Sequence, residues 1–302
     1  MDTVLITGGT GLVARKLTEK LMSEGYSVSI LSRSGNKTSE IRQYQWDPDK
    51  EEVDKESVEK ADYIIHLAGA GVGDKRWSQK RKKEIIDSRV KTAELLLKAI
   101  NESGTRIKSF ISISGTGYYG TNTSEKIFIE ADPPASDFLG ETCRLWEEAA
   151  DRFAETGARV VKLRAGIVLS GRGGVLKRII TPVRFGIGSA IGSGKQYVPW
   201  IHIDDLCQIF IKAIEDQNIK GVYNAVAPDH ITNRDLMRSL SEVCRKPFWF
   251  PAIPEFLMKM IFGEMSGILL EGSRVSSEKI LSAGYSFRYP GLCEALEEAV
   301  RG

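Results

Sequence analysis

Cysteine and histidine are scarce in this chain, which has 302 residues but four cysteines and three histidines. The cysteines lie far apart and form no CxxC pair: Cys143, Cys207, Cys244 and Cys293. This spacing argues against a disulfide framework and against a zinc site, and it favours a reducing cytoplasm. The histidines, at positions 66, 202 and 230, are too widely spaced to suggest a metal cluster. We therefore expect a cytoplasmic protein without a metal.

Long apolar runs and a dominant charge are also missing. No run approaches the roughly 18 apolar residues of a membrane span, and the first residues enter a strand pattern at once, with no room for a signal peptide. The formal net charge is +2, so no polyanionic partner is implied. The segment 75–83 holds six basic residues. Its interleaved apolar positions favour a solvated helix face over a nucleic-acid patch, so we expect neither a membrane nor a nucleic-acid partner.

A glycine turn near the N-terminus is the most informative feature that is present. The apolar run 3–6 is followed by Gly8, Gly9 and Gly11, and then by apolar residues spaced four apart from Val13 onwards. Strand, glycine turn and helix together predict a dinucleotide site, because glycines let the backbone approach a pyrophosphate and the helix N-terminus offers N–H groups to it. A glycine turn without a ligand is the alternative.

An acidic residue is absent where NAD-binding proteins usually have one. Such proteins place Asp or Glu after the second strand, to bind the ribose 2′-hydroxyl. The segment 27–37 holds no acid, and Arg33 lies at the expected position, between Ser32 and Ser34. Because a guanidinium fits a phosphate bidentately, this pattern favours NADP. A solvated loop arginine is the alternative interpretation.

Strand and helix patterns alternate through the first half of the chain. This alternation predicts an α/β fold, a doubly wound parallel sheet of the Rossmann type, with the ligand beyond the carboxyl ends of the strands. A second turn of small residues, 66–71, follows the fourth strand. The predicted strands are 2–6, 26–31, 42–46, 62–67, 108–114 and 159–163, and the predicted helices are 12–24, 78–101 and 140–155.

The pattern changes after residue 170. A glycine-rich, partly basic connection covers 171–194; Asp204 or Asp205 then caps a helix, and 221–226 is a further strand. We expect a cofactor-binding domain over 1–170, completed by about 201–228. The segments 171–200 and 229–302 would form a smaller, mostly helical substrate lobe, with Arg184, Tyr197 and Trp200 lining its pocket.

Several motifs together resemble one family. They are Thr-Gly-Gly-Thr-Gly at 7–11, Leu-Ser-Arg at 31–33, Trp-Asp-Pro at 46–48, His-Leu-Ala-Gly-Ala-Gly at 66–71, Lys-Arg-Trp at 75–77, Ile-Asp-Ser-Arg-Val at 86–90, Ser-Gly-Thr-Gly-Tyr-Tyr-Gly at 114–120, Trp-Glu-Glu-Ala-Ala at 146–150, Pro-Trp-Ile-His-Ile-Asp-Asp at 199–205, Tyr-Asn-Ala-Val-Ala-Pro at 223–228 and Gly-Glu-Met at 263–265. Almost end to end, the chain resembles extended short-chain dehydrogenases/reductases, and more closely the NAD-dependent epimerase/dehydratase proteins that have an added C-terminal segment.

The resemblance implies a set of NADP contacts. The glycine turn and the first N–H groups of its helix would hold the pyrophosphate, and Ser32 with Arg33 the 2′-phosphate. Arg89 is also a candidate for a phosphate contact because it lies on the inner face of the 78–101 helix, from which it could reach a bound dinucleotide. The full set is Gly8, Thr10, Gly11, Leu12, Val13, Ser32, Arg33, Leu67, Ala68, Gly69, Glu84, Arg89, Ile113, Arg164 and Ile167. The resemblance also implies a homodimer formed through the 78–101 and 140–155 helices.

The catalytic pair of the wider superfamily is missing. That pair is Tyr-x-x-x-Lys, and the matching positions hold Leu139 and Cys143, or Phe138 and Thr142 in the adjacent register. The hydroxyl position falls on Gly115, between Ser114 and Thr116. Tyr118 and Tyr119 are the substitute acids that we name, with Ser114 beside them, although packing is the simpler interpretation of both tyrosines.

Two functions follow from an intact cofactor motif beside a degraded catalytic pair. The first is an NADP-dependent oxidoreductase or epimerase that acts on a small polar substrate such as a nucleotide sugar. The second is an NADP-binding sensor without turnover. The glycine-rich segment and the C-terminal tail favour the enzyme, because they supply material for a substrate pocket.

Overall fold

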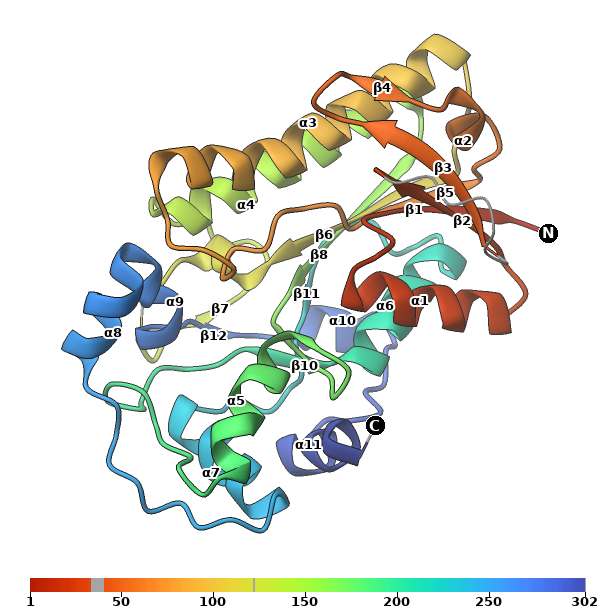
Figure 1. Ribbon diagram of the computed structural model, residues 1–302. Coiled ribbons are helices and arrows are strands. Elements are labelled where there is room, and N and C mark those ends of the chain that lie inside the picture. The colour runs from red at the N-terminus through yellow and green to blue at the C-terminus, as the bar shows by residue number, and fades with distance from the viewer. Residues whose placement is uncertain (34–40, 122, 302) are drawn as a thin grey trace.

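The chain folds around an eight-stranded sheet that is parallel except at one edge (Figure 1). This computed structural model describes residues 1–33, 41–121 and 123–301. The strand order β11-β8-β6-β5-β1-β2-β3-β4 reverses direction between β1 and β5, as in a doubly wound sheet, so the predicted fold class is confirmed. The strands are β1 (Thr3–Thr7), β2 (Ser27–Ser32), β3 (Arg42–Asp47), β4 (Glu52–Val53), β5 (Tyr63–His66), β6 (Ser109–Gly115), β8 (Arg159–Ala165) and β11 (Gly221–Ala225).

Helices cover both faces of the sheet. One face is covered by α1 (Leu12–Ser23) and α6 (Ile203–Glu215), and the other by α2 (Lys55–Glu59), α3 (Gln79–Ser103) and α4 (Phe138–Asp151) (Figure 1). The helix expected at 140–155 begins two residues earlier, at Phe138, and ends in a 3-10 turn, η2 (Arg152–Thr156). All three predicted helices are present.

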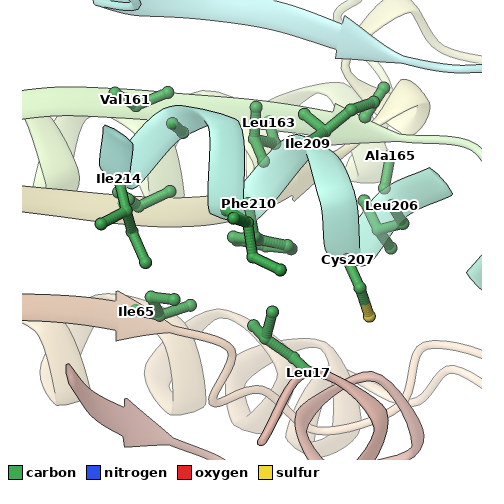
Figure 2. Close-up of a cluster of buried hydrophobic side chains, with 14 of the residues drawn as sticks. Leu17, Ile65, Val161, Leu163, Ala165, Leu206, Cys207, Ile209, Phe210 and Ile214 are labelled. Atoms are coloured by element: carbon green, nitrogen blue, oxygen red, sulfur yellow. The ribbon is translucent and has the colours of Figure 1, made fainter. Parts of the chain in front are cut away.

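The sheet separates two apolar cores because successive strand residues point to opposite faces. Leu5 and Ile64 belong to the core beneath α3 and α4, whereas Ile6 and Ile65 belong to the core beneath α1 and α6. Figure 2 shows the second core, in which Leu17 of α1 and Phe210 of α6 gather with side chains of β5 and β8. The pairing of β1 with β5 aligns Thr7 with His66, so both strands end at the same edge of the sheet.

The segment expected to be a glycine-rich connection contains a helix. Residues 174–184 form α5 (Gly174–Arg184), and Leu176, Ile180 and Val183 are buried along one side of it. The glycines that flank α5 hid this spacing in the sequence. These side chains join a separate apolar cluster with α7 (Asn233–Val243) and α11 (Leu292–Arg301).

The remaining elements are short. They are η1 (Thr116–Tyr119), β7 (Ile127–Phe128), β9 (Ile167–Leu169), β10 (Trp200–His202), α8 (Glu255–Phe262), η3 (Gly263–Ser266), α9 (Gly267–Leu270), β12 (Arg274–Val275) and α10 (Glu278–Ser282). Within the described ranges, no helix is both long and apolar enough to cross a membrane. All four cysteines are free.

Two expectations about residues 200–205 are wrong. The N-cap of α6 is His202, whose Nδ1 accepts a hydrogen bond from the backbone N–H of Asp204, so neither aspartate is the cap. Trp200 cannot line a pocket, because it is fully buried and its indole N–H donates to the carbonyl of Asp229. Asp204 and Asp205 instead lie in the first turn of α6, where their charges favour the helix dipole.

Asp205 ties the C-terminal tail to the sheet. Its carboxylate is fully buried and accepts hydrogen bonds from the hydroxyl of Tyr285 (2.7 Å) and from the backbone N–H groups of Arg288 (2.7 Å) and Tyr289 (3.0 Å). These donors are 80 or more residues away in the sequence. One side chain therefore satisfies three buried donors of the segment that leads into α11.

We expect Asp205→Ala to lower the free energy of unfolding by about 3 kcal/mol or more, because each buried donor that loses its partner costs about 1–3 kcal/mol. Asp205→Asn keeps an acceptor oxygen and should be less damaging. Denaturant titration followed by circular dichroism measures both values. Equal stability of Asp205→Ala and the unchanged chain would contradict this role.

Candidate functional site

The turn between β1 and α1 comes very close to the end of β5. Gly8 has a φ of +67°, and a Cβ on it would lie 2.9 Å from the carbonyl oxygen of Leu67. A Cβ on Gly9 would lie 2.0 Å from Cγ2 of Ile30. The turn therefore requires glycine at both positions, for backbone conformation at the first and for space at both.

Thr7 joins the two turns that follow β1 and β5. Its buried hydroxyl oxygen accepts hydrogen bonds from the backbone N–H groups of Leu67 and Ala68, both at 3.1 Å. The sequence motif 7–11 included Thr7, but we assigned it no role. It fixes the second turn of small residues against the first, and so both turns meet at the switch point of the sheet.

The N-terminus of α1 is open to an anion. Its N-cap is Gly11, no side chain caps it, and its first turn contains no acid. Thr10 and Gly11 are exposed, and Leu12 and Val13 are half-buried. Free N–H groups and the positive end of a helix dipole suit a pyrophosphate.

The end of β2 presents a cation next to this turn. Ser32, the last residue of β2, is buried, and Arg33 directly after it is exposed. Ser34 lies outside the described residues. The order β1-β2 places this position beside the glycine turn, at the same edge of the sheet. Arg33 therefore lies where a 2′-phosphate would need it.

Two buried arginines of α3 hold the turn at 69–71. Arg89 donates to the carbonyl oxygen of Ala70 (3.0 Å) and lies 4.6 Å from the centre of the Trp146 ring; a Cβ on Gly69 would come within 3.0 Å of its guanidinium carbon. Arg81 donates to Gly71 (2.6 Å) and pairs with Glu84 (2.8 Å). Among the described residues no carboxylate pairs with Arg89, and burial lowers its pKa to about 10.

Arg164 belongs to a buried network and not to an open surface. Its guanidinium forms two hydrogen bonds of 2.8 Å with the carboxylate of Glu147, and it donates to the hydroxyl of Tyr119 at 2.9 Å. Only 2% of Arg164 is exposed. This geometry gives Arg164 a structural role in place of the cofactor contact that we predicted, whereas Ile113 and Ile167 are half-buried near it and remain candidates.

Two of the three candidate catalytic groups belong to the same network. The hydroxyl of Tyr119 donates to the side-chain oxygen of Asn224 (2.7 Å) and accepts from Arg164, and burial raises the pKa of Tyr119 to about 12. The hydroxyl of Ser114 donates to Glu147 (3.0 Å). Both residues are buried and engaged, so the geometry favours the packing interpretation for Tyr119 and a supporting role for Ser114.

Leu139 and Cys143 of α4 lie against the turn η1 that follows β6. A Cβ on Gly117 would lie 3.3 Å from Cβ of Leu139 and 3.9 Å from the sulfur of Cys143. Burial raises the pKa of Cys143 to about 11, so the thiol is neither a nucleophile nor a substitute for the lysine charge.

Tyr118 is the candidate acid that stays accessible. It is half-buried, and the guanidinium carbon of Arg164 lies 3.3 Å from the centre of its ring. Burial raises the pKa of Tyr118, and the nearby Arg164 charge opposes that shift. The phenol is therefore protonated at neutral pH, which is the form that can donate a proton.

Comparison with known proteins decides the family. Residues 4–225 match the NAD dependent epimerase/dehydratase family. The chain belongs to this family. Residues 253–299 also match a domain of unknown function, DUF1731, which is the added C-terminal segment.

Individual relatives support this assignment. Epimerase family protein YfhF of Bacillus subtilis is 33% identical, over 98% of this chain and 97% of its own. The crystal structure of human epimerase family protein SDR39U1 (isoform 2) with NADPH is 32% identical, with a TM-score of 0.90 over 99% of both chains. A nucleoside-diphosphate sugar epimerase from Corynebacterium glutamicum is 32% identical, with a TM-score of 0.80 over 99% of this chain and 58% of that one.

His66, the first residue of the 66–71 motif, is buried and contacts the side chains of Thr92 and Trp146. Its Nε2 lies 2.9 Å from the hydroxyl of Thr92, and its Nδ1 accepts from the indole of Trp146 at 3.3 Å. Burial lowers the pKa of His66 to about 3, so the ring stays neutral. Sequence reasoning also assigned no role to Glu147 and Asn224, although both lie in quoted motifs of this epimerase-family chain.

We expect Tyr119→Phe to lower the free energy of unfolding by about 1–3 kcal/mol, because Arg164 loses an acceptor and Asn224 loses a donor inside the core. Tyr118→Phe is the matched control, because its ring can still lie over Arg164, and it should change stability by well under 1 kcal/mol. Chemical denaturation of both variants checks this. Equal stability losses would show that Tyr119 is no more structural than Tyr118.

Proposed function

We propose that this epimerase-family chain binds NADPH in the site formed by the first glycine turn, the end of β2 and the 66–71 turn. The pyrophosphate would be held by N–H groups of Gly11, Leu12 and Val13, and the 2′-phosphate by Ser32 and Arg33. The rest of the cofactor site would be lined by Gly8, Thr10, Leu67, Ala68 and Gly69. Arg89 and Glu84 would reach the cofactor from α3, and Ile113 and Ile167 would lie at its nicotinamide end. The absence of an acid between 27 and 33 and the NADPH named for the human relative support this choice.

We further propose that the chain is an oxidoreductase or epimerase in which Tyr118 donates the proton. The observation on which this depends is that Tyr118 is half-exposed and protonated, whereas Tyr119 and Ser114 are buried and bonded. When bound, NADPH would supply the hydride that reduces a carbonyl substrate, whereas an epimerase would need the oxidised form, NADP⁺, to take the hydride from the sugar alcohol before returning it. Arg164 keeps a positive charge against the Tyr118 ring and so stabilises the phenolate that proton donation leaves.

The proposed substrate is a small polar molecule, with nucleoside-diphosphate sugars first, because the Corynebacterium relative is named for that class. We assign its binding to a smaller lobe formed by residues 171–200 and 229–302, against a cofactor domain of 1–170 and about 201–228. An apolar cluster of α5, α7 and α11 packs the interior of this lobe. A homodimer through α3 and α4 and a cytoplasmic location remain predictions.

An NADPH-binding sensor without turnover is the second candidate. The observation that favours it is that neither register of the Tyr-x-x-x-Lys pair, Leu139 with Cys143 or Phe138 with Thr142, holds the tyrosine or the lysine in this sequence. A sensor needs the glycine turn and Arg33 but no acid. Cofactor binding is therefore common to both proposals, and turnover separates them.

We expect Arg33→Ala to reduce the preference for NADPH over NADH by at least tenfold, which equals about 1.4 kcal/mol. Arg42→Ala is the control, because Arg42 is also exposed but lies at the start of β3, beside Ser29, and pairs with Glu56 at 2.7 Å. Calorimetric titration with both cofactors measures two dissociation constants for each protein, one for NADPH and one for NADH. Preference for NADH in the unchanged chain, or an unchanged preference in Arg33→Ala, would refute the NADPH site.

We expect Tyr118→Phe to lower turnover by about a hundredfold or more, because general acids contribute about 10²–10⁴-fold. The assay follows the absorbance of NADPH and the sugar products with UDP-glucose, UDP-glucuronic acid and their 4-keto derivatives. Turnover that persists in Tyr118→Phe would exclude Tyr118 as the acid. Tight NADPH binding with no turnover of any of these sugars would favour the sensor.

A further inference from the structure

A cavity of about 280 Å³ lies beside the first turns of α1. Its walls come from α1, the loop after β9, the start of α6 and the C-terminal helix α11 (Figure 1). Leu12 is the only lining residue that also belongs to the proposed cofactor site. The volume is at the lower end for ligand pockets and suits a small metabolite, not a dinucleotide. The proposed function gives this cavity no role.

His202 lines this cavity and has one ring nitrogen that can donate a hydrogen bond. Its Nδ1 accepts from the backbone N–H of Asp204 at 3.2 Å, so the neutral ring has its proton on Nε2. Burial lowers the pKa of His202, which keeps the ring neutral, and only 3% of the residue is exposed. No group in the described part of the chain accepts a hydrogen bond from Nε2. His202 lines the cavity, so this unsatisfied donor is available to an occupant.

Most charged groups around the cavity neutralise one another. Asp204 is surrounded by Lys16 (3.2 Å), Lys20 (3.3 Å) and Arg288 (4.0 Å), and Glu19 lies 3.4 Å from Arg172. Two lining side chains have no charged partner in the described ranges, namely Arg15 on α1 and Glu298 on α11. One unpaired cation and one unpaired anion thus face the same space from opposite helices.

We propose that this cavity binds a zwitterionic metabolite of the α-amino acid class. Its carboxylate would accept hydrogen bonds from Nε2 of His202 and from Arg15, and its ammonium group would face Glu298. A simple anion is disfavoured, because it would meet the unpaired carboxylate of Glu298. A simple cation is disfavoured by Arg15 and by the N-terminus of α6.

The test is binding of individual L-amino acids to the full chain by calorimetry and ligand-observed NMR, with inorganic phosphate and ethylamine as probes of each charge alone. We expect at least one amino acid to bind, more tightly than either single-charge probe. Arg15→Ala, Glu298→Gln and His202→Asn should each weaken it by tenfold or more. His202→Asn is chosen because asparagine retains a side-chain oxygen that can cap α6 while the Nε2 donor is lost.

Glu297→Gln is the matched control, because Glu297 is on the same helix, pairs with Arg301 (3.2 Å) and does not line the cavity. It should leave binding unchanged. No binding of any L-amino acid, or binding that the three lining variants do not weaken, would overturn the proposal. Phosphate binding as tightly as the best amino acid would identify an anion site instead and would also overturn it.

Discussion

The ion pair between Arg164 and Glu147 is the interaction on which the candidate site depends. It joins β8 to α4 in the interior, where an unpaired charge is very costly, so each partner requires the other. Around the pair, Ser114 adds the end of β6 and Tyr119 adds η1. The buried charge pair therefore holds Ser114 and Tyr119 in place, and this is why two of the three candidate hydroxyls are already engaged.

The same pair determines what chemistry remains. In the superfamily, a tyrosine and a lysine on the helix equivalent to α4 provide the acid and the charge that tunes it. Here that helix presents Leu139 and a neutral Cys143, and the positive charge near the end of β6 is Arg164, below the ring of Tyr118. The structure thus retains a cation beside a phenol, but the cation, Arg164, is on strand β8 and the phenol, Tyr118, is on the 3-10 turn η1. The charge is fixed by Glu147, so it cannot move with the substrate.

The fold and the glycine turn could be predicted because they depend on local sequence patterns. The geometry around Tyr119 could not, because it depends on contacts between residues far apart in the sequence. The strand-glycine-helix pattern at 3–23 involves neighbours in sequence, so composition and spacing were sufficient. The bond from Tyr119 to Asn224 joins residues 105 apart, and nothing in either local segment indicates it. Helix α5 was missed for another reason: its apolar spacing at Leu176, Ile180 and Val183 is short and flanked by glycines. His202 was overlooked as a cap because the acids after it match the usual capping residues better.

The C-terminal segment of unknown function is part of this same arrangement. The side-chain amide of Asn224 donates to the carbonyl oxygen of Ser276 (3.0 Å), and the hydroxyl of Ser273 donates to the carbonyl oxygen of Gly120, directly after Tyr119 (2.9 Å). Glu264 pairs with Lys82 of α3 at 2.6 Å, one residue from Arg81. The segment therefore contacts both the Tyr119 network and the helix that holds the 69–71 turn. Because these contacts come from the far end of the chain, the geometry around Tyr118 requires the complete fold and not the sheet domain alone.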